Sequence, residues 1–340
     1  MSRPSALVAS LALALALAAC SGGAAPSASP SGETQPSATS SAAAATRPPC
    51  GTVKIAQNAW AGYYANVAVV SYLLRNELGC DVEVVDLDEE TSWSALPTGE
   101  VDAILENWGH EDLAKQYITD QGVAVDLGPS GNEGVIGWFV PKFYADEHPE
   151  ILTAATNPKI LNTLAKDFVT SESKGKGQVL DGAESFGAMD EDIIRNLGLD
   201  YSVVYSGSEA TSNAAIKAAI EARQPILAYY WTPNYFSTQV DLVHVPLPPY
   251  VPGCDADTAK ITCTDYPPYA LNKVVSKSFA ESGSPAFTVV KNFTWTNADQ
   301  DGVAYDIAVN GMSYDDAATK WLDAHPDVWK AWLAGIPGVG

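Results

Sequence analysis

Basic residues are scarce in this chain of 340 residues, which carries 19 Lys and Arg against 41 Asp and Glu. The resulting formal charge of −22 repels the phosphates of nucleic acids and the head groups of anionic lipids. The composition therefore excludes a nucleic-acid-binding protein. It is compatible with a small cationic or zwitterionic ligand, although the same acidity also keeps an exported protein soluble.

Histidine and the common catalytic motifs are scarce as well. The four histidines are scattered, and the spacing of the cysteines fits no zinc site. The sequence has no Gly-x-Ser-x-Gly elbow, no phosphate-binding loop and no His-Glu-x-x-His motif. We therefore expect no metal, no cofactor and no catalysis, and an enzyme remains only an alternative class.

The N-terminal apolar run, residues 7–19, is too short for the membrane helix of a folded domain. Arg3 precedes it and small residues end it, as in an export signal. Its last residues, Leu17-Ala18-Ala19, lead into Cys20 and look like a bacterial lipobox. We predict that residues 1–19 are removed and that Cys20 carries lipid. A plain secretory peptide cut near Ala19 is the alternative.

The segment that follows, residues 20–49, is almost entirely Ser, Ala, Pro, Gly and Thr. It has no large apolar side chain and cannot bury enough surface to fold, so it is expected to be a disordered tether. A lipidated cysteine with a tether behind it would keep the domain at the extracytoplasmic face of the cell membrane.

The remaining four cysteines lie in an exported domain, where disulfides form. They are Cys50, Cys80, Cys254 and Cys263, and four cysteines allow three connectivities. We favour Cys50–Cys80 and Cys254–Cys263 because each pair brackets one local unit. The first pair precedes two neighbouring strands, and the second flanks a loop rich in Pro and Asp.

Strand and helix patterns alternate through residues 50–340. This rhythm predicts an α/β fold with a parallel sheet and helices on both faces. A first set of strands is expected at residues 52–57, 82–87, 101–106 and 134–140. A second set is expected at 178–180, 202–205 and 225–231, before a late strand at 271–276 and helices at 285–292, 296–310, 313–325 and 327–334.

If the last helices return to the first set, the chain crosses between two lobes twice, near residues 140 and 245. Lobe 1 would then comprise residues 50–140 and 246–340, and lobe 2 residues 141–245. Two crossings make a hinge, with a cleft that closes around a ligand.

Two tryptophans stand where predicted strands end. Trp231 precedes Pro233, which cannot donate to a sheet ladder, and Trp108 precedes Gly109. Open α/β sheets place ligands at such ends. Two indoles there predict an aromatic site for a weakly hydrated cation such as a quaternary ammonium, through cation–π contacts.

These motifs resemble the substrate-binding proteins of ABC importers for glycine betaine, proline betaine and choline, of the OpuAC and ProX type. The segment 230–235, Tyr-Trp-Thr-Pro-Asn-Tyr, is similar to a Trp-Thr-Pro segment of that family. Asn107-Trp108 with His110 resembles its Asn-Trp-x-Pro-x-His segment, without the proline. Residues 181–187 resemble its Gly-rich loop, where Phe186 replaces tryptophan. The resemblance implies a type II periplasmic-binding-protein fold.

The resemblance also implies a site. It predicts an aromatic cage of Trp60, Trp108, Trp231 and Phe186, or alternatively one in which Tyr64 takes the place of one of them. The donors for a betaine carboxylate would be the Ser185 hydroxyl, backbone N–H groups around Gly187, and His110. Glu106 lies two residues before Trp108 on the same strand face. It either faces the cation or bonds a loop.

The function so implied is that of a monomeric, lipid-anchored receptor that captures an osmolyte and delivers it to a membrane permease. Glycine betaine is the expected ligand, and choline, another osmolyte or an amino acid is the alternative. Because Arg195 and Arg223 fall on helices and are expected to be exposed, an amino-acid receptor lacks an evident partner for the carboxylate. A sensor or adhesive lipoprotein without a transport role is the alternative of another class.

Overall fold

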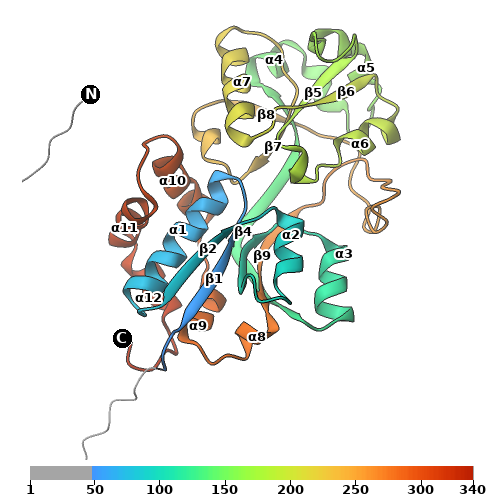
Figure 1. Cartoon of the computed structure of the whole chain (residues 1–340). Coiled ribbons are helices and arrows are strands. Elements are labelled where there is room, and N and C mark those ends of the chain that lie inside the picture. Colours follow the sequence, from blue (N-terminus) through green and yellow to red (C-terminus); the bar gives the residue numbers. More distant parts are fainter. Residues whose placement is uncertain (1–47, 340) are drawn as a thin grey trace, which may run out of the picture. The chain divides into compact units, whose positions relative to one another are not determined.

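The computed structural model describes residues 48–339, which lie in one compact unit (Figure 1). The predicted signal, the lipidation residue Cys20 and nearly all of the tether fall outside the described residues. The described strands pair into a nine-stranded sheet in the order β2-β1-β3-β9-β4-β7-β5-β6, with β8 paired to β4.

Lobe 1 is the part of the sheet formed by β1, β2, β3 and β9, with the helices packed on it. Its central strand β3 is buried throughout because side chains pack on both of its faces. Leu105 joins a cluster with α1, whereas Ile104 packs with Trp93 of α2. The elements are β1 (Thr52–Gln57), α1 (Ala61–Asn76), β2 (Asp81–Asp86), α2 (Glu89–Ala95), β3 (Ala103–Asn107), α3 (Glu111–Ala114), η1 (Lys115–Asp120), β9 (Tyr269–Ser276), α8 (Lys277–Ala280), α9 (Pro285–Asn292), α10 (Asn297–Ala308), α11 (Tyr314–Ala324) and α12 (Pro326–Trp332).

Lobe 2 is formed by β5, β6, β7 and β8 with their helices. β5 pairs in parallel with β6 and β7, as the alternating pattern predicts. Its elements are α4 (Lys142–Glu147), η2 (Pro149–Thr153), α5 (Ile160–Leu164), η3 (Ala165–Phe168), β5 (Gly177–Asp181), η4 (Glu184–Phe186), α6 (Asp190–Leu197), β6 (Tyr201–Tyr205), α7 (Glu209–Glu221), β7 (Ala228–Thr232), η5 (Tyr235–Thr238) and β8 (Leu242–Val245).

One long strand, β4 (Ala124–Pro141), belongs to both lobes (Figure 1). It pairs with β9 as far as Gly134 and with β7 from Val135 onward. The first crossing therefore lies before the expected boundary at residue 140. The first half of β4 was not expected to be a strand, because Gly128 and Pro129 are typical of a loop. The structure accommodates them with register shifts against β9.

The sheet is mixed rather than parallel, which corrects the expectation from the alternating pattern. β9 runs antiparallel to both β3 and β4, and β4 runs antiparallel to β7 and β8. The reason is the hinge itself, because a chain that leaves lobe 1 along β4 returns along β9 in the opposite direction. The parallel pairing holds for β1 with β2 and β3.

Both predicted disulfides, Cys50–Cys80 and Cys254–Cys263, are present. The second closes part of the loop between β8 and β9, residues 246–268, which we call the disulfide loop. This loop packs on lobe 2, where Asn196 of α6 donates to the Cys263 carbonyl at 2.8 Å. The chain thus returns to lobe 1 only at β9, well after the expected crossing near residue 245.

Candidate ligand-binding site

A cavity of about 620 Å³ is lined by residues of both lobes. Lobe 1 contributes Trp60 and Trp108, and lobe 2 contributes Phe186 and Trp231. The aromatic residues predicted from two separate strand ends are therefore brought to one place. This cavity is the candidate site.

The Phe186 ring stands nearly at right angles to two of the other rings. Trp60 and Phe186 have ring centroids 6.1 Å apart and planes inclined by 86°. Phe186 and Trp231 lie 5.7 Å apart at 85°. Successive perpendicular rings form the walls of a box, so several π faces can meet one group placed inside it.

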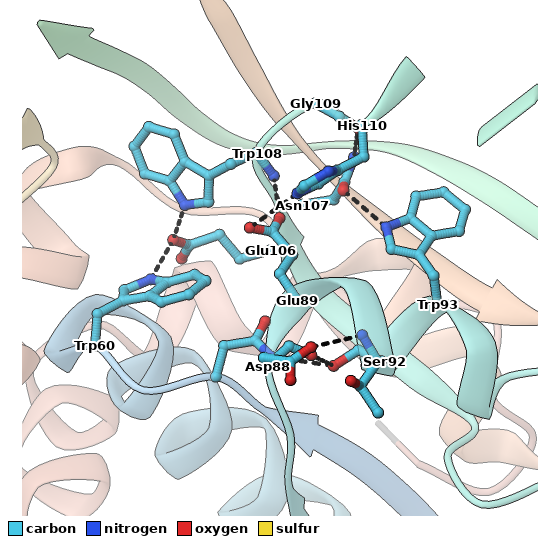
Figure 2. Close-up of polar contacts among 12 residues, drawn as sticks. Trp60, Asp88, Glu89, Ser92, Trp93, Glu106, Asn107, Trp108, Gly109 and His110 are labelled. Atoms are coloured by element: carbon cyan, nitrogen blue, oxygen red, sulfur yellow. Dashed lines mark hydrogen bonds and ion pairs between the residues drawn. The ribbon is translucent and has the colours of Figure 1, made fainter. Parts of the chain in front are cut away.

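Glu106 holds two of the indoles through a single oxygen atom (Figure 2). Its Oε1 accepts from Trp60 Nε1 at 2.9 Å and from Trp108 Nε1 at 2.7 Å. Its Oε2 accepts from the side-chain amides of Asn66 and Gln300. Glu106 therefore bonds the walls of the cage and does not itself line the cavity, although the sequence left both roles open.

Burial and these four hydrogen bonds act in opposite directions on the pKa of Glu106. Burial, at 1 % exposure, raises the pKa of its carboxyl above the usual range, while the four hydrogen bonds lower it. Hydrogen bonds polarise the groups they join. A carboxylate that accepts from an indole N–H therefore increases the electron density on the faces of the indole ring. The pair of indoles is thus oriented and made more attractive to a cation.

Trp108 is also fixed through its backbone. Its N–H donates to Glu89 Oε1 at 2.7 Å, and the second oxygen of Glu89 lies 3.3 Å from His110 Nε2 (Figure 2). Burial lowers the pKa of His110, but the nearby carboxylates of Glu89, Asp112 and Glu90 together outweigh it and the net shift is upward. His110 is therefore engaged by an anion of the protein itself.

Glycines let the rings approach the backbone. Gly109 has a φ of +104°, and a Cβ there would lie 3.1 Å from the Tyr269 ring. A Cβ on Gly134, where β4 changes partners, would lie 2.5 Å from the Trp108 indole. Likewise, the Phe186 ring packs over Gly182, where a Cβ would lie 2.6 Å away. Trp108 consequently rests on the hinge strand.

The Trp60 wall is tied to lobe 2. Trp60 precedes α1 in an extended conformation, and it supplies no side-chain cap to that helix. Glu209 of α7 in lobe 2 accepts instead from the Ala61 N–H at 2.8 Å. Asn234 Nδ2 donates to the other oxygen of Glu209 at 2.9 Å, and burial raises the pKa of Glu209 to about 7.

Two of the predicted site residues do not line the cavity. Tyr64 points from α1 toward α11, where its ring stacks on Tyr314 at 6.0 Å. Ser185 is exposed in the short turn η4. The others do line it, namely Trp60, Trp108, His110, Phe186, Gly187 and Trp231.

Other lining residues were missed from the sequence. Tyr229 lines the cavity beside Trp231, and strand alternation, which puts residues two apart on one face, could have found it. The Tyr269 ring packs against the Trp108 ring with their centroids 5.5 Å apart. It comes from β9, far along the chain. The disulfide loop adds Tyr250, Asp255 and Ile261, for which the sequence offers no signal because a loop carries no periodicity.

The fold and the cavity define a class, the two-lobed solute-binding proteins of the type II periplasmic-binding-protein fold. Residues 51–324 match the family described as the substrate binding domain of the ABC-type glycine betaine transport system. The chain belongs to this family, whose members bind solutes for ABC transporters and are not enzymes. No helix among residues 48–339 has both the length and the apolar character needed to span a membrane.

Several known proteins are similar to this chain. The trimethylamine N-oxide-binding protein of Pelagibacter ubique is 26 % identical over 280 residues, covering 79 % of this chain and 87 % of that protein. A choline-binding protein in complex with choline superimposes with a TM-score of 0.67 at 16 % identity, covering 84 % and 93 %. Lactococcal OpuAC in complex with glycine betaine gives 0.61 at 23 %, covering 83 % and 99 %.

Proposed function

We propose that this protein is a lipid-anchored receptor that captures a small trimethylammonium compound between its lobes and delivers it to an ABC permease. The observation that carries the proposal is the box of perpendicular aromatic rings contributed by both lobes. A trimethylammonium head is bulky and charged but cannot donate an N–H bond, so aromatic faces are its natural partners.

Closure would follow from the same geometry. Trp60 and Trp108 belong to lobe 1 and Phe186 and Trp231 to lobe 2, so a ligand meets all of these walls only when the lobes come together. Contacts made only in the closed state shift the open–closed equilibrium toward it. The closed form would be the one that the permease accepts.

The anchor and the oligomeric state belong to the proposal too. A lipid on Cys20, followed by the tether, would hold the receptor beside the permease at the extracytoplasmic face. Because the cavity is built from one chain, a monomer suffices for binding. Mass spectrometry of the membrane fraction, compared with a Cys20→Ser variant, would detect the lipid.

Binding is tested by calorimetric titration of the purified protein with choline, glycine betaine and trimethylamine N-oxide. We expect one of them to bind saturably, and Trp231→Ala to weaken that ligand by about a hundredfold, as buried aromatic anchors do. Trp329→Ala in α12 is the matched control and should bind like the parent. If none of the three binds the folded parent protein, the proposed function is wrong.

A further inference from the structure

The charge of the cavity wall narrows the ligand class, on the premise of the proposed function. The lining includes six carboxylate side chains, which are Glu89, Glu90, Glu111, Asp112, Asp126 and Asp255. Among the described residues that line it, none is lysine or arginine. Its histidine, His110, faces Glu89 at 3.3 Å. A ligand in this cavity therefore meets several carboxylates that no lysine or arginine of the lining balances.

Several backbone donors of the loop that was expected to bind a betaine carboxylate are already engaged. Phe186 N–H donates to the Ala183 carbonyl at 2.9 Å and Gly187 N–H to the Glu184 carbonyl at 3.3 Å. Met189 N–H donates to the Tyr266 hydroxyl at 2.9 Å. These three N–H groups close the turn of the loop or bond the disulfide loop, so they are not available to an anion.

Several side-chain donors near the cage are engaged too. The indole N–H groups of Trp60 and Trp108 both bond Glu106. Asn107 Nδ2 donates to the Gly109 carbonyl at 2.7 Å and to Asn272 at 2.9 Å. The Ser185 hydroxyl, which was expected to bind a carboxylate, lies outside the lining.

Arg195 and Arg223, the arginines considered from the sequence, supply no positive charge to the cavity either. Arg195 lies beside Asp192 of its own helix, and Arg223 pairs with Glu147 at 2.5 Å. Both guanidinium groups are more than half exposed, and neither residue lines the cavity. A buried ligand carboxylate that has no lysine or arginine beside it is disfavoured.

We infer that this receptor selects trimethylammonium compounds with a net positive charge, of which choline is the simplest with a hydroxyl tail, over zwitterions such as glycine betaine. We call the six carboxylates of the lining the acidic rim. This rim raises the local concentration of a cation and repels a carboxylate. An uncharged tail needs only a neutral partner, and the phenols of Tyr229 and Tyr269 line the same cavity.

The test compares affinities of the full chain for choline, glycine betaine, trimethylamine N-oxide and tetramethylammonium, by calorimetry at low ionic strength. We expect the affinity for choline to exceed that for either zwitterion about tenfold or more, because only the zwitterions bring negative charge to an acidic wall. Tetramethylammonium, which has the head group but no tail, should also bind.

A variant isolates the effect of the rim. Glu90→Gln/Glu111→Gln/Asp112→Asn removes three exposed rim charges. It should lower the affinity for choline and reduce the ratio of the choline and glycine betaine affinities about threefold or more. Added salt should erase this difference between the parent and the variant. Glu83→Gln/Glu100→Gln/Glu221→Gln removes the same charge from exposed positions outside the lining and should leave the ratio unchanged.

The possible outcomes separate this inference from the proposed function. Glycine betaine or trimethylamine N-oxide binding as tightly as choline, or tighter, overturns the inference and leaves the proposed function standing. A choline-to-betaine ratio that both triple variants change equally also overturns it. Failure of all four compounds to bind the folded protein overturns the proposed function and the inference together.

Discussion

Glu106 fixes two walls of the candidate site although it does not line the cavity itself. Its carboxylate lies behind the cage and receives two indoles on one oxygen and two amides on the other. A replacement with fewer acceptor atoms would leave some of these donors without a partner. The cage is therefore as dependent on Glu106 as on the rings themselves.

Glu106→Gln places an amide N–H₂ against groups that are themselves donors. We expect it to lower the free energy of unfolding by about 1–3 kcal/mol, the cost of leaving a buried polar group without a partner. Ligand affinity should also fall, by about tenfold or more, because two walls of the cage lose their orientation. Chemical denaturation and calorimetry measure the two effects.

Glu83→Gln on the exposed strand β2 is the control for this substitution and should behave like the parent. A Glu106→Gln protein with parental affinity would show that the indoles do not need the carboxylate.

Individual residues were predictable where a local pattern marks them. Trp231 and Trp108 stand at strand ends, so their convergence follows from the general layout of α/β sheets. The role of Glu106 was not predictable, because its partners Trp60 and Gln300 are distant in sequence and meet it only after folding. Tyr64 was misleading because its place in α1, not its aromatic nature, decides which way it faces.

At the scale of elements, the N-terminus of α1 is capped by the other lobe. Glu209 begins α7 in lobe 2 and accepts from Ala61 N–H in lobe 1. A helix N-terminus has unpaired N–H groups and attracts a carboxylate. Because Trp60 directly precedes Ala61, this contact connects the position of lobe 2 to that of a cage wall.

Glu209→Ala removes this contact between the lobes. We expect ligand affinity to fall about tenfold, the value of one hydrogen bond to a charged group, because the closed form loses a contact that holds it. Glu221→Ala, at the exposed C-terminal end of the same helix, is the control. Equal affinities of the two variants, measured by calorimetry, would contradict a role for Glu209 in closure.

The two disulfides should differ in what they support. Cys254–Cys263 closes the loop that carries Tyr250, Asp255 and Ile261 into the cavity. Cys50–Cys80 joins the starts of β1 and β2, away from the cavity. The first should therefore matter for the site and the second for the stability of the fold.

We expect Cys254→Ser/Cys263→Ser to weaken binding, since a free loop must be ordered by the ligand. Cys50→Ser/Cys80→Ser should leave affinity unchanged and lower the free energy of unfolding by about 2–4 kcal/mol, as loss of a disulfide does. Calorimetry and denaturant unfolding measure both variants. Identical effects of the two pairs on affinity would contradict the assignment of the disulfide loop to the site.

The elements themselves were largely predictable because the strand and helix periods are strong. What the sequence did not predict is β4, since Gly128 and Pro129 interrupt the strand pattern that the register shifts accommodate. The antiparallel centre was missed for a related reason. Strand direction at the hinge is set by the return of the chain on β9, which no local pattern records.

At the scale of the whole molecule, buried acids shift the dependence of stability on pH. Burial raises the pKa of Glu209 and Asp301 to about 7 and that of Asp181 to about 8. In the unfolded chain these groups release their protons at ordinary acidic pH. Between the ordinary pKa values of the unfolded chain and the raised pKa values of the folded state, the folded state binds more protons than the unfolded state. The free energy of unfolding therefore falls as pH rises through this range.

We therefore expect the melting temperature to be lower at pH 8 than at pH 5.5. The raised pKa of His110 acts in the same direction, whereas burial lowers the pKa of His244, which opposes it at the acidic end of this range. Circular dichroism across this range measures the trend, and Glu209→Gln/Asp301→Asn should flatten it. A melting temperature that rises toward pH 8 would contradict this account.

The central claim is that the ligand is bound through its own positive charge, which contacts the aromatic faces of the site. Choline and its uncharged carbon analogue 3,3-dimethyl-1-butanol have nearly the same shape, so titrating the protein with both isolates the charge. We predict that choline binds about a hundredfold or more tightly, as several desolvated cation–π contacts require. Comparable affinities would mean that the cavity recognises shape and apolar surface alone, and the aromatic-cage account would be wrong.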